Sequence, residues 1–335
     1  MIDHSEFIIN NFKLQCGVVL PRLMLAYKTY GQLNQSRDNA VVLPTFYTGS
    51  HQRNEGYFGK GRAVDPDDHF IISINLIGNG ISSSPSNMDS PFEGANFPTV
   101  TLYDNIRAQH ALLTEQLGVK SIALVTGWSM AGCQSYQWAA QYPDLVKAIV
   151  PYCASAKTST HNWVFLEGVK AALKADATFN GGNYENIPEQ GLKAFGRVYA
   201  GWAYSQTFYR KEMYRSLGFD SAEELLRDWE QDHLNWDAND LLAKLDIWQR
   251  GDISDNDVYN KNFKDALSSI KAKTIVISCS DDLYFRPEDN ELEVMYIKGG
   301  RHECYSSPWG HCVASGQNDL GFHEFLDQCI REVMD

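Results

Sequence analysis

Short apolar segments recur along this chain and alternate with stretches of helical periodicity. Several are apolar at consecutive positions rather than at every second one, which is typical of strands buried on both faces of a parallel sheet. A strand followed by a helix, repeated along the chain, predicts a doubly wound, mostly parallel α/β sheet. We expect strands at residues 40–46, 69–77, 121–127, 147–154, 273–280 and 292–300.

The alternation stops in the middle of the chain. Residues 158–268 hold several helical patterns separated by Gly- and Asn-rich loops such as FNGGNYENIP, which predicts a helical cap inserted into the sheet domain. The predicted core is therefore in two parts, residues 1–157 and residues 269–335. Within its first part, residues 12–33 have the pattern of antiparallel strands at a sheet edge.

Composition restricts the partners and the compartment. The formal charge of −13 argues against the basic surface that nucleic-acid phosphates or anionic lipids require, so we expect a small-molecule partner, no nucleic acid and no membrane. The chain begins without a basic segment followed by an apolar one, and no run of 18 apolar residues occurs. With seven scattered cysteines, an odd number, the sequence predicts a cytoplasmic protein with reduced thiols.

The segment GWSMAG, residues 127–132, follows an apolar run and precedes a helical stretch. A serine at a sharp turn from strand to helix needs small neighbours, because strand and helix pass closely there. Gly127 and Ala131 are those neighbours of Ser129, so the pattern departs from G-x-S-x-G by one methyl group. We predict that Ser129 is the nucleophile of an α/β-hydrolase fold, the alternative being an ordinary turn serine.

A serine hydroxyl needs a base and an orienting acid to react at neutral pH. Asp281 and Asp282 follow the strand predicted at 273–280; we favour Asp281 as the acid, with Asp282 an outward-facing turn residue. Two histidines follow the next strand, and we favour His311 over His302 because its loop is long enough to reach back over the sheet. Ser129, Asp281 and His311 then follow the chain order of α/β-hydrolase triads.

An oxyanion hole requires two N–H donors near the nucleophile. One is expected from the backbone of Met130, directly after the serine, and the other from the loop LPTFYTGSH, with Tyr47 as the donor. A zinc site is conceivable from His302, Cys304, His311 and Cys312, but their spacing matches no known zinc motif. We therefore expect neither a metal nor another cofactor.

Five segments together resemble the homoserine O-acetyltransferase family of α/β-hydrolases, over most of the chain. Residues 61–80 resemble the family segment before an Asn-x-x-Gly loop, and GWSMAGCQSYQWAAQYPD resembles its nucleophile segment. SDDLYFRPED resembles the acid segment, WGHC falls where the family has Gly-His-Asp, and FYTG falls at its oxyanion loop. The resemblance implies a cap that mediates homodimers and, within the cap, an Arg and a Tyr seven residues apart that hold the acceptor amino acid.

Arg197 and Tyr204 have that spacing, the alternative being a pair that merely packs on a cap helix. The family's aspartate after the catalytic histidine meets the acceptor's ammonium, but this chain has Cys312 there, and a thiol cannot supply that charge. We further expect Trp202 and other cap aromatics, Tyr199 and Trp163 among them, to line a compact apolar pocket or to pack in the cap.

The missing carboxylate favours water over an amino acid as the acyl acceptor. We therefore predict a serine esterase that hydrolyses short-chain, acetyl-type esters through an acyl-enzyme intermediate, as in the esterase branch of similar sequences. The first alternative is a homoserine O-acetyltransferase that uses acetyl-CoA. The second, from another class, is a binding protein without turnover on the same fold.

Overall fold

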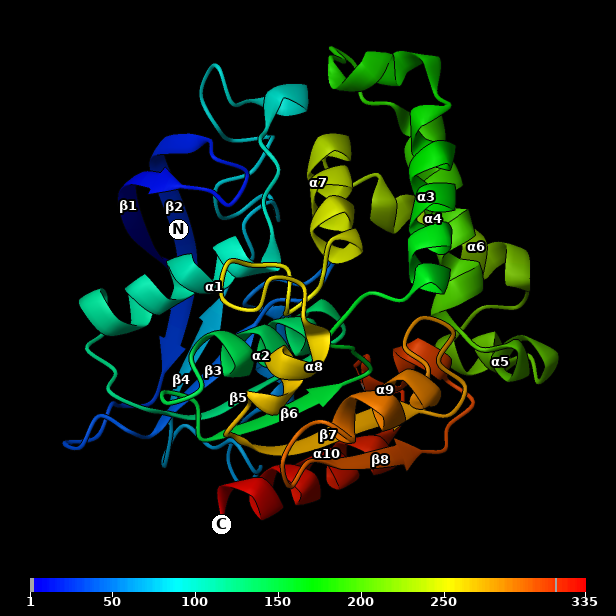
Figure 1. The fold of residues 1–335 in the computed structure, drawn as a ribbon. Helices are drawn as coiled ribbons and strands as arrows, with labels where there is room; N and C mark the ends of the chain where they lie inside the picture. The colour runs from blue at the N-terminus through cyan, green and yellow to red at the C-terminus, as the bar shows by residue number, and fades with distance from the viewer. Residues whose placement is uncertain (1–2, 317) are drawn as a thin grey trace.

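The computed structural model describes residues 3–316 and 318–335. Its centre is one eight-stranded sheet with the order β1-β2-β4-β3-β5-β6-β7-β8 (Figure 1). The strands are β1 (Ser5–Lys13), β2 (Val19–Tyr30), β3 (Ala40–Pro44), β4 (Phe70–Ile74), β5 (Ile122–Trp128), β6 (Ala148–Tyr152), β7 (Lys273–Cys279) and β8 (Arg301–Tyr305).

The pairing confirms the α/β-hydrolase fold class. All neighbours from β4 to β8 pair in parallel, whereas β1 pairs with β2 and β2 with β4 in antiparallel fashion, as expected for the edge. Every residue of β3 and of β6 is buried. Such strands need apolar side chains on both faces, which is why their sequences lack the alternation of a half-exposed strand.

Helices cover both faces of the sheet (Figure 1). Helix α2 packs against β5 and β6, and α10 packs against β6 and β7. These flanking helices are α1 (Leu102–Ala111), α2 (Met130–Gln141), α8 (Phe263–Ser268), α9 (Pro287–Val294) and α10 (Leu320–Met334). A π-helical turn, Leu112–Gln116, continues α1 and is followed by Gly118 at φ +69°, the left-handed conformation in which helices often end.

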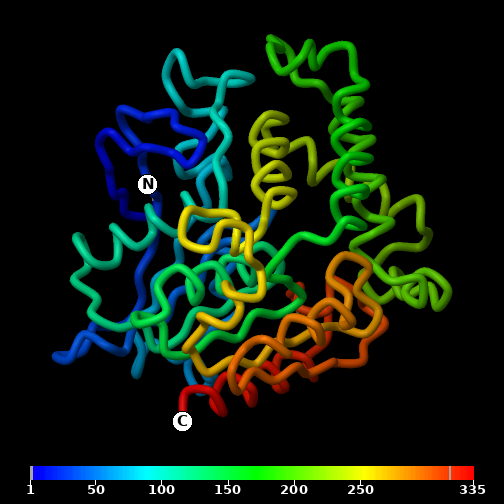
Figure 2. Tube along the Cα trace, viewed as in Figure 1, coloured from blue at the N-terminus to red at the C-terminus, as the bar shows by residue number. Residues whose placement is uncertain are grey.

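Five further helices lie between β6 and β7. They are α3 (Thr160–Lys174), α4 (Glu189–Ala203), α5 (Gln206–Arg210), α6 (Ala222–His233) and α7 (Ala238–Gln249). Helix α4 packs against α3 and α6, and α3 against α7. We call residues 160–249 the helical insertion; Figure 2 shows it gathered away from the C-terminus. Its helices fall inside the predicted cap, whose limits as a domain stay a prediction.

The strand predicted at residues 292–300 is wrong. Helix α9 occupies Pro287–Val294, and the edge strand β8 begins only at Arg301. Pro287 at the start of the helix and the acidic residues Glu288 and Asp289 in its first turn are favourable helix-starting signals that outweigh the short apolar run. In the part of the chain that the structure describes, no helix has the length and apolar character needed to cross a membrane.

Candidate active site

Ser129 lies at the junction of β5 and α2 in a strained backbone conformation, φ 60° and ψ −128°. Its N–H donates to the carbonyl oxygen of Tyr152 at 3.0 Å, and its own carbonyl accepts from the N–H of Cys133 at 3.0 Å. Strand β6 and the first turn of α2 thus hold the serine in a geometry that a free chain would avoid. The predicted turn is present at this position.

Close packing around this turn explains the small residues. A Cβ added to Gly127 would lie 2.4 Å from the Cβ of Ala131, and one added to Gly132 would lie 2.5 Å from the Cβ of Ala154. One methyl group therefore fits between strand and helix, and Ala131 provides it. The departure from G-x-S-x-G is tolerated because Gly127 leaves room for it.

His311 lines the same cavity as Ser129, and its Nδ1 lies 2.7 Å from the Oδ2 atom of Asp282. The prediction of Asp281 as the orienting acid is wrong. Asp282 is fully buried, and its other oxygen accepts from the N–H groups of Tyr284 at 2.7 Å and Phe285 at 3.2 Å. The N–H of Asp282 donates to the carbonyl of Cys279 at 3.1 Å.

The hydrogen bond from Asp282 to Cys279 closes a turn after β7, and this turn directs the Asp282 side chain inward. The preceding residue, Asp281, is half-buried and accepts from the hydroxyl of Ser280 at 3.1 Å. The alternative base, His302, lies on β8, where its Nε2 is 2.7 Å from the hydroxyl of Ser278. Neither residue lines the cavity that contains Ser129 and His311.

Aromatic rings hold the imidazole of His311 in place. The indole of Trp128 stacks on it at 5.1 Å between ring centroids and donates from Nε1 to the His311 carbonyl at 3.1 Å. Tyr284 meets it edge-on at 4.6 Å. Gly310, at φ +64°, lets the chain pass Ser205 of the helical insertion, because an added Cβ would lie 2.8 Å from the Ser205 nitrogen.

The two residues predicted to supply the oxyanion amides, Met130 and Tyr47, follow Ser129 and β3 respectively. Met130 is the first residue of α2, so its N–H has no acceptor within the helix. Tyr47 follows β3 and lines the same cavity as Ser129. Sequence reasoning missed Gln134, whose Nε2 donates to the carbonyls of Thr45 at 2.9 Å and Met130 at 3.2 Å. This side chain ties the Tyr47 loop to the helix that follows the serine.

The cavity above Ser129 has a volume of about 190 Å³. The sheet ends contribute one wall and the helical insertion the other. Its lining residues are Phe46, Tyr47, Thr48, Arg53, Trp128, Ser129, Tyr199, Ala203, Tyr204, Asp228, Trp229, Asp232, His233, His311, Cys312 and Ser315. A space of this size has room for a small ester.

Of the predicted substrate-binding and pocket residues, Tyr204 and Tyr199 line this cavity, and Arg197, Trp202 and Trp163 do not. Arg197 points into the insertion, where its guanidinium pairs with Glu230 and, at 2.7 Å, with Glu223. Trp202 packs on Phe165 at 4.7 Å between ring centroids and does not line the cavity. Both carboxylates belong to helix α6, which packs against α4, so Arg197 pairs with α6 instead of reaching the cavity.

Two buried thiols accompany the histidine and its acid. Burial raises the pKa of the Cys312 thiol to about 12, so Cys312 is neutral at physiological pH. Burial and the carboxylate of Asp282 also raise the pKa of the Cys153 thiol. Neither side chain offers a negative charge to a ligand. All seven cysteines, each within the described residues, carry free thiols.

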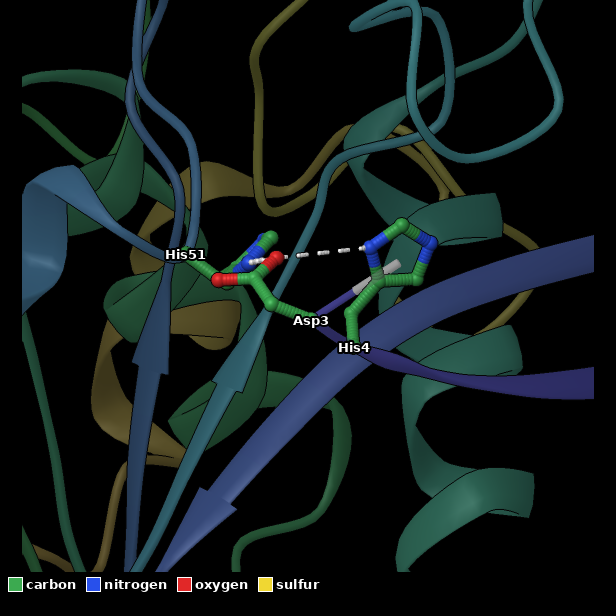
Figure 3. A group of neighbouring side chains, drawn as sticks. All are labelled: Asp3, His4 and His51. Atoms are coloured by element: carbon green, nitrogen blue, oxygen red, sulfur yellow. Dashed lines mark hydrogen bonds and ion pairs between the residues drawn. The ribbon is translucent and has the colours of Figure 1, made fainter. Parts of the chain in front are cut away.

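Two groups of side chains in the described residues have metal-like spacing. One consists of Cys153, Asp282 and His311, which belong to the site above. The other is Asp3, His4 and His51 (Figure 3).

The second group does not fit a metal. Asn75 Nδ2 donates to the Ala26 carbonyl at 3.0 Å and lies 3.0 Å from His51 Nδ1, which must then accept. Nε2 of His51 therefore carries the proton and donates to Asp3 at 3.0 Å, leaving no lone pair for a metal. Lys28, 3.3 Å from the same carboxylate, adds a competing cation.

The fold and this site define a hydrolase of the α/β type. The family model of the alpha/beta hydrolase fold matches residues 41–313, and the chain belongs to that family. Within the family it falls among esterases and homoserine O-acetyltransferases, as its sequence segments suggested.

The chain is 34% identical to an ethyl acetate hydrolase of Pseudomonas veronii, a match that covers 99% of this chain and 96% of that protein. It is 32% identical to a homoserine O-acetyltransferase of Trichormus variabilis, covering 90% of this chain and 86% of that protein. Among solved structures, the acetyl esterase MekB matches with a TM-score of 0.95 at 34% identity, covering 99% of this chain and 96% of that one.

Proposed function

We propose that this protein is a serine esterase that hydrolyses short-chain, acetyl-type carboxylic esters with Ser129, His311 and Asp282 as its catalytic residues. The observation that carries the proposal is one small cavity shared by a strained serine and a histidine whose Nδ1 lies 2.7 Å from a buried aspartate. A relative that hydrolyses ethyl acetate and a structural neighbour named as an acetyl esterase support the substrate class.

The first half-reaction forms the acyl-enzyme. His311 Nε2 takes the proton of the Ser129 hydroxyl as its oxygen attacks the ester carbonyl, and Asp282 fixes the imidazole through Nδ1–H. The backbone N–H groups of Tyr47 and Met130 donate to the oxyanion that develops in this step. Losing one such donor typically lowers the rate by about 10²- to 10³-fold. The alcohol then leaves with the proton from His311.

The second half-reaction releases the acid. His311 takes a proton from water, the resulting hydroxide attacks the acyl carbonyl, and the same two amides hold the second oxyanion. Collapse of this intermediate returns the proton to Ser129. Atoms balance as ester plus water giving alcohol plus carboxylic acid.

An acetyltransferase is the second candidate, because homoserine O-acetyltransferases are also among the relatives. Two observations favour water as the acceptor. Cys312, a neutral thiol, follows His311 where an ammonium-binding carboxylate is expected, and Arg197 is engaged by Glu223 and Glu230 rather than free for a substrate carboxylate. We therefore place hydrolysis first.

One pair of assays separates the candidates. The purified protein is given ethyl acetate in one reaction, and acetyl-CoA with homoserine in the other. We expect acetate release from the ester and negligible O-acetylhomoserine. Fast formation of O-acetylhomoserine with little ester hydrolysis would replace the esterase by the transferase.

A third arm tests catalysis against binding without turnover. Ser129→Ala is expected to lower kcat for ester hydrolysis by at least about 10³-fold, because the acyl-enzyme cannot form. Ser216→Ala, on an exposed serine outside the cavity, serves as the matched control. Undiminished activity in Ser129→Ala would exclude the catalytic role proposed for this serine.

The homodimer through the cap is also a proposal. The apolar residues Trp163, Val164 and Val198 of helices α3 and α4 are exposed, and a second copy covering them would remove this surface from water. Sedimentation or light scattering of wild type and Trp163→Glu tests it. The cytoplasmic location stays a prediction of the sequence.

A further inference from the structure

Lys244 is a fully buried lysine in helix α7, with no part of its side chain exposed. Among the described residues its Nζ has no hydrogen-bond partner. The ammonium lies instead over two aromatic faces, 4.1 Å from the ring centroid of Trp236 and 5.1 Å from that of Tyr47. Tyr47 belongs to the loop whose amide serves the oxyanion in the proposed function.

An acidic side chain one turn earlier on the same helix forms its hydrogen bonds with other groups. Asp240, itself buried, accepts from the N–H of Ser86 at 3.0 Å and from its hydroxyl at 2.6 Å. Burial raises the pKa of Asp240. Burial lowers the pKa of Lys244 to about 7, so its amine is charged below that pH, and it lacks the close partner that usually offsets the loss of hydration.

Helix α7 holds the side chain of Tyr47 at several points. The Tyr47 hydroxyl donates to the carbonyl of Leu241 at 3.3 Å, and the ring lies 6.3 Å from that of Trp248. Leu241, Lys244 and Trp248 recur at helical spacing, so they share one face of α7. On the cavity side, the ring of Tyr199 stacks on Tyr47 at 5.5 Å with an interplanar angle of 10°.

We propose that Lys244 is a positioning residue for the oxyanion hole, its ammonium drawing the Tyr47 ring against α7 and so fixing the direction of the Tyr47 N–H. The attraction is that of a cation for an aromatic face, which is strongest when water is excluded. The inference rests on the proposed function, because it assigns the Tyr47 amide to the oxyanion. It adds that the helical insertion controls this amide through a charge.

The stability and the kcat of a Lys244 variant distinguish a positioning role from a packing role. Replacing a buried, unpaired charge with an apolar side chain of similar volume is often neutral or stabilising. Lys244→Met is therefore expected to leave the unfolding temperature unchanged or raised, while at pH 6.5, where the wild-type lysine is mostly protonated, kcat for ethyl acetate falls about tenfold and KM stays within about twofold. A structural role would lower stability and activity together.

Lys170→Met is the matched control. Lys170, on α3, is also buried in the insertion, but it pairs with Asp246 and Gln249 and does not line the cavity. Its loss is expected to lower the unfolding temperature and to leave kcat unchanged. Lys244→Gln, neutral and of similar length, gives the same kinetic test should the methionine variant fail to fold.

Two further measurements locate the effect at the oxyanion. A small alkylboronic acid forms a tetrahedral adduct with the serine, so its affinity should fall by the same factor as kcat in Lys244→Met. In a Tyr47→Leu background, which retains the backbone N–H, Lys244→Met should change kcat no further. Additive losses in the double variant, or an unchanged kcat in folded Lys244→Met, would overturn the proposal.

The two proposals fail separately. Undiminished hydrolysis in Ser129→Ala removes the serine mechanism and the oxyanion assignment with it. An inactive Ser129→Ala together with a normal Lys244→Met leaves the esterase intact and removes only the role of the lysine.

Discussion

The sheet and the helical insertion enclose the same cavity in different ways. At the sheet ends, backbone geometry determines position: Ser129 is held at φ 60°, and Asp282 is held in a turn closed by its N–H to the Cys279 carbonyl. In the insertion, ring packing between helices determines position. Tyr199 of α4 contacts Phe165 of α3 and Trp229 of α6, at 5.5 and 6.0 Å between ring centroids.

The difference indicates how each region responds to substitution. A residue fixed by a tight turn has one allowed arrangement, so a change there abolishes the chemistry or the fold. A side chain held by ring contacts can repack, so a change there adjusts the rate or the substrate range. The predictions below test this contrast.

The largest effect is expected from the acid at the end of β7. Asp282→Asn should lower kcat about 10⁴-fold, as removal of the charge that orients a triad histidine does, while Asp281→Asn should change kcat by less than about threefold. Steady-state kinetics on a short-chain nitrophenyl ester measure both. The reverse ranking would return the role to Asp281.

The second-largest effect is expected at the turn between β5 and α2 that holds Ser129. Gly127→Ala places a Cβ 2.4 Å from that of Ala131, so we expect a loss of about 1–3 kcal/mol in the free energy of unfolding and a displaced Ser129. Urea denaturation measures the first and kcat the second. Adding Ala131→Gly should recover part of both losses; no recovery would place the strain elsewhere.

A smaller effect concerns the pH dependence of stability. Burial lowers the pKa of Lys244 from 10.5 to about 7, so between these two values the folded protein binds fewer protons at this group than the unfolded chain does. The wild type should therefore gain stability relative to Lys244→Met as pH rises from 7 to 10.

Charges near the lysine are common to both proteins. They belong to Asp232, Asp237, Asp240 and His233, all of which remain in the variant. Urea denaturation of both proteins across this range provides the measurement. A stability difference independent of pH would mean that Lys244 has an ordinary pKa.

The smallest effect is expected in the insertion, at Arg197. Its side chain is 37% exposed, so its pairs with Glu223 and Glu230 should contribute no more than about 1 kcal/mol to the free energy of unfolding. Arg197→Met should leave KM for ethyl acetate within about twofold. A large rise in KM would show that this arginine reaches the substrate after all.

The same contrast separates what could be predicted from what could not. The α/β-hydrolase class, the antiparallel edge and the turn at Ser129 follow from periodicity and from short-range sterics. Asp282 was missed because two adjacent aspartates carry the same local signal, and only the turn to Cys279 and the approach of His311 distinguish them. The edge strand was misplaced because a short apolar run, such as the one at the end of α9, is compatible with either a helix or a strand.

The amino-acid sequence by itself determined the alternation of strands and helices as far as β7, the elbow at Ser129 and the candidate base, since these depend on residues close together in the chain. Tertiary structure alone decided which aspartate contacts His311, that Arg197 pairs with carboxylates of α6 and that Lys244 is buried against Tyr47. Each of these depends on a partner tens to hundreds of residues away. Such a partner is selected by packing and by the electrostatic cost of burial, which only the assembled fold sets.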